Sequence, residues 1–130
     1  MPNRVLHFVV PHEPRPKQMG ALIKGRVVVR GHARAFEDIV RLHCRLERMR
    51  QGAPILPGPV AVTLHAFVGD ARTVDADNLA KCALDGLKRE AFEDDRQVIE
   101  LHVFKAVDRD RPRLEIEIFD LAPALGEAGA

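Results

Sequence analysis

Acidic residues gather in one short stretch of this 130-residue chain. Asp75 and Asp77 form one pair, Asp94 and Asp95 form a second pair, and Lys81 lies between them. Carboxylates held within a few ångströms of one another repel strongly and require a cation. Because all of these ligands would be oxygen atoms, the pattern favours Mg²⁺, with Mn²⁺ as a substitute, over zinc. Lys81 would then stabilise charge that develops on a metal-bound phosphate.

Each of these residues also has an ordinary structural interpretation. An Asp just before a helix caps free backbone N–H groups and is favoured there by the helix dipole, so capping is the alternative for Asp75 and Asp77. Lys81 follows Asp77 by four residues, which is the spacing of a common ion pair on a helix surface.

The element that must position the acidic pairs is a helix predicted over residues 78–89. Its apolar residues recur at helical spacing, namely Leu79, Ala83, Leu84 and Leu87. A helix of a dozen residues is about 18 Å long and cannot bring its own ends together. The pairs can therefore meet only if the chain after Gly86 turns back, or if the strand that carries Asp94 and Asp95 lies beside the strand that leads to Asp75.

Three motifs follow one another here: D-x-D-N-x-x-K at residues 75–81, D-x-L at residues 85–87 and D-D-x-Q-V at residues 94–98. Together they resemble the signature of the RusA-type Holliday junction resolvases, a family common in phages and prophages. The resemblance implies a Mg²⁺-dependent, structure-selective endodeoxyribonuclease that resolves four-way DNA junctions by paired symmetric nicks in DNA recombination and repair. It also implies a homodimer, since paired symmetric cuts need two sites and this chain carries one candidate.

The resemblance further assigns roles to single residues. The metal ligands that it implies are Asp75, Asp77, Asp94 and Asp95. The catalytic residues that it implies are Asp75, Asp77, Lys81 and Asp95. In these roles the carboxylates hold the metal, and Lys81 stabilises the charge of the pentacovalent phosphorus.

A proline-rich loop near the N-terminus is a candidate DNA contact. Residues 14–18 read P-R-P-K-Q and match the family's P-x-P-K-Q-R up to the last position, where Met19 replaces the expected cation. The neighbouring prolines reduce the entropy that Arg15 and Lys17 would lose on contacting phosphate. With two further cations near the acidic stretch, the DNA-binding residues that we expect are Arg15, Lys17, Arg72 and Lys105. The alternative is that these cations are solvated.

The fold expected from the pattern is a single α+β domain over residues 1–120, with a flexible tail at residues 121–130. Strands are predicted over residues 4–10, 22–30, 60–68, 97–105 and 113–119, and helices over residues 33–50 and 78–89. The order is β-β-α-β-α-β-β, which indicates a mixed sheet covered by two helices. We expect the first two strands to form one hairpin and the last two to form another.

The first predicted helix is amphipathic and basic. Its apolar face is expected to contain Phe36, Ile39, Val40, His43, Leu46 and Met49. The opposite face contains Arg34, Arg41, Arg45 and Arg48. This basic face either contacts DNA or is solvated.

Charge is distributed unevenly along the chain. Residues 1–50 hold 11 Arg or Lys against 4 Asp or Glu, whereas residues 51–130 hold 9 against 15. A basic half joined to an acidic half suits a surface that grips phosphate around a metal site. No apolar run is long enough to cross a membrane and the first residues lack a signal-peptide pattern, so we expect a cytoplasmic protein. Cys44 and Cys82 fall in predicted helices and are interpreted as free thiols.

Two other functions share most of these features. A less selective nuclease that cuts branched or flap DNA would carry the same motif residues, because selectivity for a junction depends on the spacing of two sites. A non-catalytic DNA-binding module could keep the fold, but the complete set of Asp75, Asp77, Lys81 and Asp95 argues against it.

Overall fold

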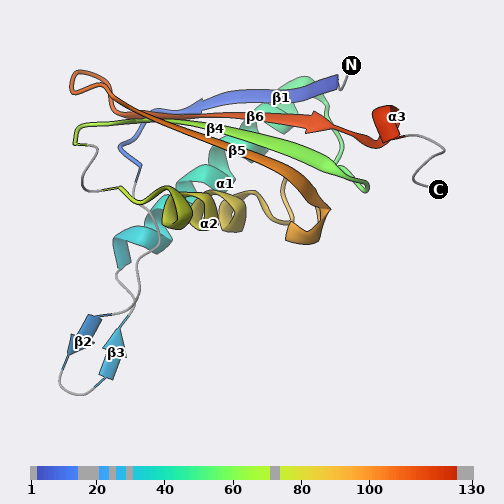
Figure 1. Cartoon of the computed structure of the whole chain (residues 1–130). Helices are drawn as coiled ribbons and strands as arrows, with labels where there is room; N and C mark the ends of the chain where they lie inside the picture. The colour runs from blue at the N-terminus through green and yellow to red at the C-terminus, as the bar shows by residue number, and fades with distance from the viewer. Residues whose placement is uncertain (1–2, 15–20, 24–25, 29–30, 71–73, 126–130) are drawn as a thin grey trace.

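The computed structural model describes residues 3–14, 21–23, 26–28, 31–70 and 74–125. Within these residues a four-stranded sheet carries both long helices on one face (Figure 1). The strands, in spatial order, are β1 (Asn3–Val10), β6 (Arg113–Asp120), β4 (Val60–Val68) and β5 (Val98–Val107). The helices are α1 (Gly31–Gln51) and α2 (Ala76–Leu87). The α+β class and the mixed sheet with two helices are therefore confirmed.

The shorter elements lie outside this framework. Strands β2 (Ala21–Ile23) and β3 (Arg26–Val28) pair only with each other in the described part of the chain, as a separate two-stranded hairpin (Figure 1). A single 3₁₀ turn, η2 (Asp95–Gln97), precedes β5, and a short helix, α3 (Ala122–Leu125), follows β6. One strand expected over residues 22–30 is thus replaced by two shorter ones.

Both predicted strand pairings are wrong. β1 pairs antiparallel with β6, and not with the segment that follows it in sequence. β5 and β6 do not pair, because β4 lies between them, parallel to β5 and antiparallel to β6. Alternating apolar residues indicate that a segment is extended, but its partner is chosen by burial. β4 is the strand with the longest buried row, so it takes a central place.

The core lies between the sheet and the two helices. Alternate residues of three strands point toward the helices and are buried: Leu6, Phe8 and Val10 from β1, Val62, Leu64 and Ala66 from β4, and Leu114, Ile116 and Ile118 from β6. The helices contribute Phe36, Val40 and Cys44 from α1 and Leu79, Ala83 and Leu87 from α2. The helical spacing of these residues brings them to one side of each helix.

The apolar face of α1 is narrower than expected. Phe36 and Val40 are buried as predicted, but Leu46 and Met49 are 54% and 66% exposed. The core line instead continues through Cys44, four residues after Val40, because the sheet reaches only one narrow side of the helix. Among the helices that the structure describes, none combines the length and the apolar character needed to span a bilayer.

Both cysteines are buried and free, as predicted. The pKa of the Cys44 thiol is raised to about 12, chiefly by burial and further by the charge of Glu90, while Arg48 opposes the shift. Cys44 is therefore protonated at neutral pH and is a core residue without thiolate chemistry.

Helices α1 and α2 touch at a glycine. A Cβ atom at Gly86 would lie 2.8 Å from the backbone oxygen of Glu37 and 2.8 Å from Cβ of Val40. Neither contact can yield cheaply, since one is a backbone atom and the other belongs to a stiff, buried side chain. Gly86 thus sets how closely α2 approaches α1.

Replacing this glycine should loosen the helix pair. Gly86→Ala is expected to lower the free energy of unfolding by about 1–3 kcal/mol, although Ala itself favours a helix by about 1 kcal/mol. Urea unfolding measures the difference. Gly58→Ala is the control, because its new Cβ would meet Cβ of Ala122 at 3.4 Å, an ordinary contact. Equal stability of Gly86→Ala and wild type would contradict the close approach.

Candidate active site

Asp75 and Asp77 lie at the N-terminal end of α2. Asp75 is the N-cap residue, and its Oδ1 accepts a hydrogen bond of 2.9 Å from the backbone N–H of Asp77. Asp77 and Lys81 are exposed on successive turns of the helix. The capping function is therefore present at Asp75, and the carboxylate of Asp77 projects from the first turn into solvent.

Asp94 and Asp95 lie on the loop after the other end of α2. Asp94 caps η2, and its Oδ1 accepts a hydrogen bond of 2.9 Å from the backbone N–H of Arg96. This bond and the Arg96 side chain hold the pKa of the Asp94 carboxyl below its usual range. Asp94 is ionised at neutral pH and is fixed by the turn it caps.

Gln97 holds this acidic loop in place. Its Oε1 accepts backbone hydrogen bonds from Glu93 at 2.8 Å and from Asp94 at 2.9 Å. Its Nε2 donates to the carbonyl oxygens of Leu56 at 2.7 Å and of Gly58 at 2.8 Å. One side-chain amide thus ties the loop to the segment that leads into β4, which is the physical reason for a Gln at this place in the motif.

Asp95 differs from the other acidic residues in its surroundings. Its Oδ1 is buried and has no hydrogen-bond partner among the described residues. Burial raises the pKa of the Asp95 carboxyl, Lys88 opposes this shift, and the negative charges of Asp85 and Asp94 add to it. An orphaned carboxylate oxygen beside further carboxylates fits a cation ligand. Sequence reasoning had named Asp85 and Lys88 only as part of a polar stripe.

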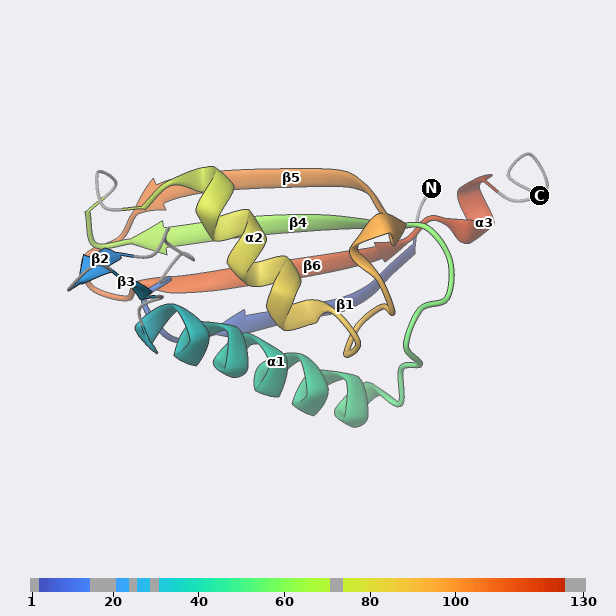
Figure 2. The same ribbon diagram turned by 90° about the horizontal axis from the view of Figure 1, so that it is seen from below.

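The two acidic pairs do not meet within one chain. The strands that lead to them do lie side by side, since β4 precedes Asp75 and β5 follows Asp95. They are parallel, however, so Asp75 lies beyond the C-terminal end of β4 and Asp95 lies at the N-terminal end of β5. Helix α2 spans the distance between these ends and is about 18 Å long (Figure 2). Across the residues that the structure describes, no three metal-ligating side chains form a cluster.

One of the expected DNA contacts can be placed. Nζ of Lys105 donates a hydrogen bond of 2.7 Å to the carbonyl oxygen of Val74, next to Asp75. Lys105 is therefore at the Asp75 end of α2. Arg15, Lys17 and Arg72 lie outside the described residues.

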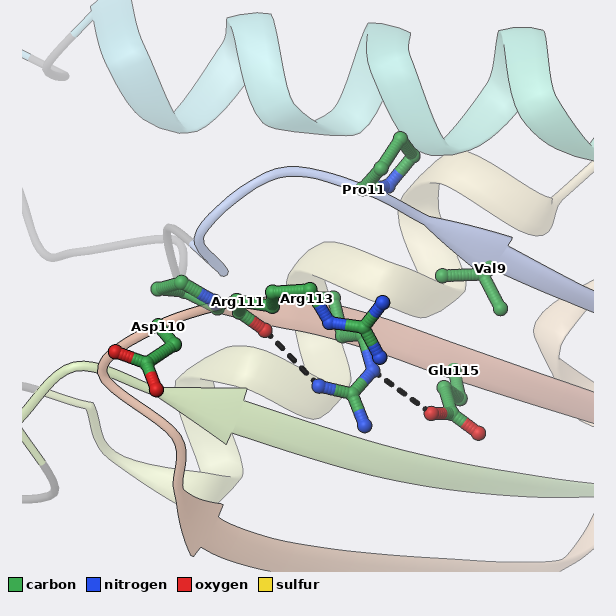
Figure 3. Close-up of a pocket in the computed structure, with 7 residues that line it drawn as sticks. Val9, Pro11, Asp110, Arg111, Arg113 and Glu115 are labelled. Atoms are coloured by element: carbon green, nitrogen blue, oxygen red, sulfur yellow. Dashed lines mark hydrogen bonds and ion pairs between the residues drawn. The ribbon is translucent and has the colours of Figure 1, made fainter.

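A hollow of about 530 Å³ lies at the end of the sheet, beside the loop that joins β5 to β6 (Figure 3). Arg113 dominates it and is already engaged, at 2.9 Å from both Asp108 and Glu115 and over the ring of Phe67. None of the candidate site residues lines this hollow. Its polar groups satisfy one another, so the hollow carries no chemistry for the site.

The basic face of α1 is partly engaged in ion pairs. Glu90 is 5% exposed and accepts hydrogen bonds from Nε of Arg45 at 3.0 Å and from a terminal nitrogen of Arg48 at 3.3 Å. Burial raises the pKa of the Glu90 carboxyl, but the hydrogen bonds and charges of the two arginines outweigh it, so the pKa is lowered. Arg45 and Arg48 thus fix the turn after α2, which solvation alone would not do.

The sequence was compared with known proteins. Residues 10–119 match the family described as endodeoxyribonuclease RusA. The crossover junction endodeoxyribonuclease RusA of Escherichia coli (strain K12) is 31% identical over 99 residues, which make up 75% of this chain and 80% of that protein. The protein of the same name from Shigella sonnei (strain Ss046) is 30% identical over 99 residues, with the same shares. The matched region includes all three acidic motifs.

The bonds of Gln97 make its removal costly. Gln97→Ala leaves two backbone carbonyls and two N–H groups without their partner, and should lower the free energy of unfolding by about 2 kcal/mol. Arg96→Ala is the neighbouring control and should leave stability unchanged, because the Arg96 side chain is 91% exposed. Chemical denaturation of both variants measures this, and equal stabilities would contradict the tether.

The Glu90 cluster should give stability a defined pH dependence. A carboxyl whose folded pKa is depressed stabilises the protein above its unfolded pKa, about 4.3, and this stability is lost as the pH falls through the folded value. Glu90→Gln should cost about 2 kcal/mol at pH 7, and the difference from wild type should shrink below about pH 4. The exposed Asp38, which pairs with Arg41, supplies the control Asp38→Asn, with little change at either pH. A difference independent of pH would exclude the ion pair as its cause.

Proposed function

Because this chain belongs to the RusA family of endodeoxyribonucleases, we propose that it is a divalent-metal-dependent resolvase that cuts four-way DNA junctions by paired symmetric nicks. The observation that carries the proposal is the division of the acidic motif between the two ends of α2. Each end presents carboxylates held by a rigid element, and the orphaned Oδ1 of Asp95 is a suitable donor for Mg²⁺ or Mn²⁺.

A second copy of the chain would complete the site. In a dimer with two-fold symmetry and the α2 helices antiparallel, Asp75 and Asp77 of one chain lie at the same end as Asp94 and Asp95 of the other. The same symmetry creates two equal sites, and paired symmetric nicks require two. A homodimer is thus demanded by the distance that α2 imposes, independently of the need for two cuts.

The residues would divide the chemistry as follows. Asp75, Asp77, Asp94 and Asp95 would hold the cation, with Gln97 fixing the loop that carries the second pair. When bound, a divalent cation activates the attacking water and stabilises the leaving oxygen of an in-line displacement. Lys81, one turn after Asp77 on α2, would stabilise the negative charge that accumulates on the phosphate.

Cations from several segments would hold the DNA. We assign this role to Arg15, Lys17, Arg72 and Lys105. Lys105 is placed for it, since it lies beside Val74 at the end of α2 that carries Asp75 and Asp77. Contacts to phosphate position the duplex arms and carry no sequence information, so the shape of the junction would be recognised by the spacing of the two sites.

The proposed activity is tested with a labelled four-way junction, a linear duplex and a flap, each with Mg²⁺ or with EDTA. Paired nicks in the junction alone, absent in EDTA, are expected. Equal cutting of all three substrates would indicate a less selective nuclease of branched and flap DNA. Binding without cutting in Mg²⁺ or Mn²⁺ would reduce the chain to a DNA-binding module.

Mixing two inactive variants tests whether the site is shared between chains. Asp75→Asn and Asp95→Asn should each abolish cleavage, and Asn at position 75 keeps the helix cap. After the two are unfolded and refolded together, each heterodimer would contain one site with both substitutions and one with neither. Nicking activity should therefore return in the mixture, with one strand cut per junction. A mixture as inactive as its components would place all ligands of each site in a single chain.

A further inference from the structure

β5 is the least covered strand of the sheet. In the described part of the chain it pairs only with β4, and its other edge faces outward (Figure 2). Its exposed apolar side chains, between 40% and 55% accessible, are Ile99, Leu101, Phe104 and Val107. A long, apolar edge strand is a template for pairing with another chain, and soluble proteins normally protect such an edge.

The exposed apolar residues lie on both faces of β5. Leu101 is opposite Val62 of β4 and so lies on the helix side of the sheet. Phe104 is opposite His65 and stacks on its ring, with the centroids 5.0 Å apart, on the outer side. A partner that covered one face would leave the other exposed, whereas a strand added to the edge lies beside both.

We propose that a second copy of this chain pairs with this edge, β5 against β5 and antiparallel, about a two-fold axis near the middle of the strand. The inference rests on the proposed function, for which it names the surface that joins the two copies. Pairing of identical strands about a two-fold axis is necessarily antiparallel, and each β5 then supplies the unpaired backbone groups that the other needs.

The direction of β5 agrees with the divided acidic motif. Asp94 and Asp95 precede the N-terminal end of β5, and Lys105 near its C-terminal end is bonded to Val74. Antiparallel pairing brings the first end of one chain against the second end of the other. Each end of the interface then combines the acidic pair of one chain with the exposed Lys81 and with Lys105 of its partner, which is a favourable pairing of charges.

The other exposed apolar surface of the described residues does not fit this role. It consists of Leu42, Leu46 and Met49 on α1, which are 52–66% exposed. α1 lies alongside β1, at the edge of the sheet opposite β5 (Figure 2). A two-fold axis there would leave the two acidic pairs far apart, and a helix has no unpaired backbone edge to offer.

Matched charge substitutions separate the two surfaces. Ile99→Lys places a cation on the β5 edge, and Leu46→Lys does so on α1, at side chains of nearly equal exposure, 53% and 54%. Sedimentation equilibrium should give a dimer dissociation constant at least about tenfold higher for Ile99→Lys and an unchanged value for Leu46→Lys. Far-UV circular dichroism verifies that both fold. A dimer weakened by Leu46→Lys and not by Ile99→Lys would overturn the proposal.

Cross-linking locates the axis without weakening the interface. The native cysteines are buried, so a single cysteine introduced at His102 or Val103 is the one that reacts. Mild oxidation should join the two chains at one or both positions, because cysteines opposite each other across the axis come within disulfide range. Met49→Cys, which is exposed on α1, is the control and should not cross-link under the same conditions. Absence of a cross-link at both β5 positions would exclude this axis.

The interface and the proposed function fail separately. A β5 dimer that does not cut junctions would retain the interface and refute the resolvase. Junction cutting by a dimer that is insensitive to Ile99→Lys and to cysteine at positions 102 and 103 would retain the resolvase and refute the interface.

Discussion

The parallel pairing of β4 with β5 is the constraint on which the candidate site depends. Because the two strands run in the same direction, the segment that leaves β4 and the segment that enters β5 lie at opposite ends of the sheet. Helix α2 connects those ends as a rigid spacer fixed to α1 at Gly86. The acidic motif, continuous in sequence, is therefore divided in space, and one chain holds half of each site. A nuclease built this way cannot work as a monomer, so assembly and activity are the same requirement.

Each half of the site is supported by contacts that have nothing to do with metal. Asp75 caps α2, and Asp94 caps η2. Gln97 ties the second acidic pair to the segment before β4, and buried Glu90, held by two arginines of α1, fixes the turn that precedes it. Placing carboxylates close together costs free energy through repulsion. These tethers hold the side chains in place without a cation, so the ligand positions are organised before metal and DNA arrive.

The elements were predictable because they depend on local patterns. The spacing of apolar residues gave both long helices and all four strands of the sheet, since each must bury one side. Pairings were not predictable in the same way. A charged turn between residues 105 and 113 indicates a reversal of the chain, but β6 reverses past β4 and not onto β5. The apolar stripe of α1 failed at Leu46 for a related reason, since periodicity shows which residues could be buried and only the sheet's position shows which are.

The sequence by itself determined the chemistry. Four Asp residues, a Lys and their spacing are properties of residue type and order, and they indicate the family and its reaction without any coordinates. Only the tertiary structure decided where that chemistry can occur. Strand direction and the length of α2 are set by packing across the whole core, and they place Asp75 and Asp95 at opposite ends of a rigid helix. Residues close in sequence were kept apart in space, because a helix of fixed rise separates its two ends whatever their charges favour.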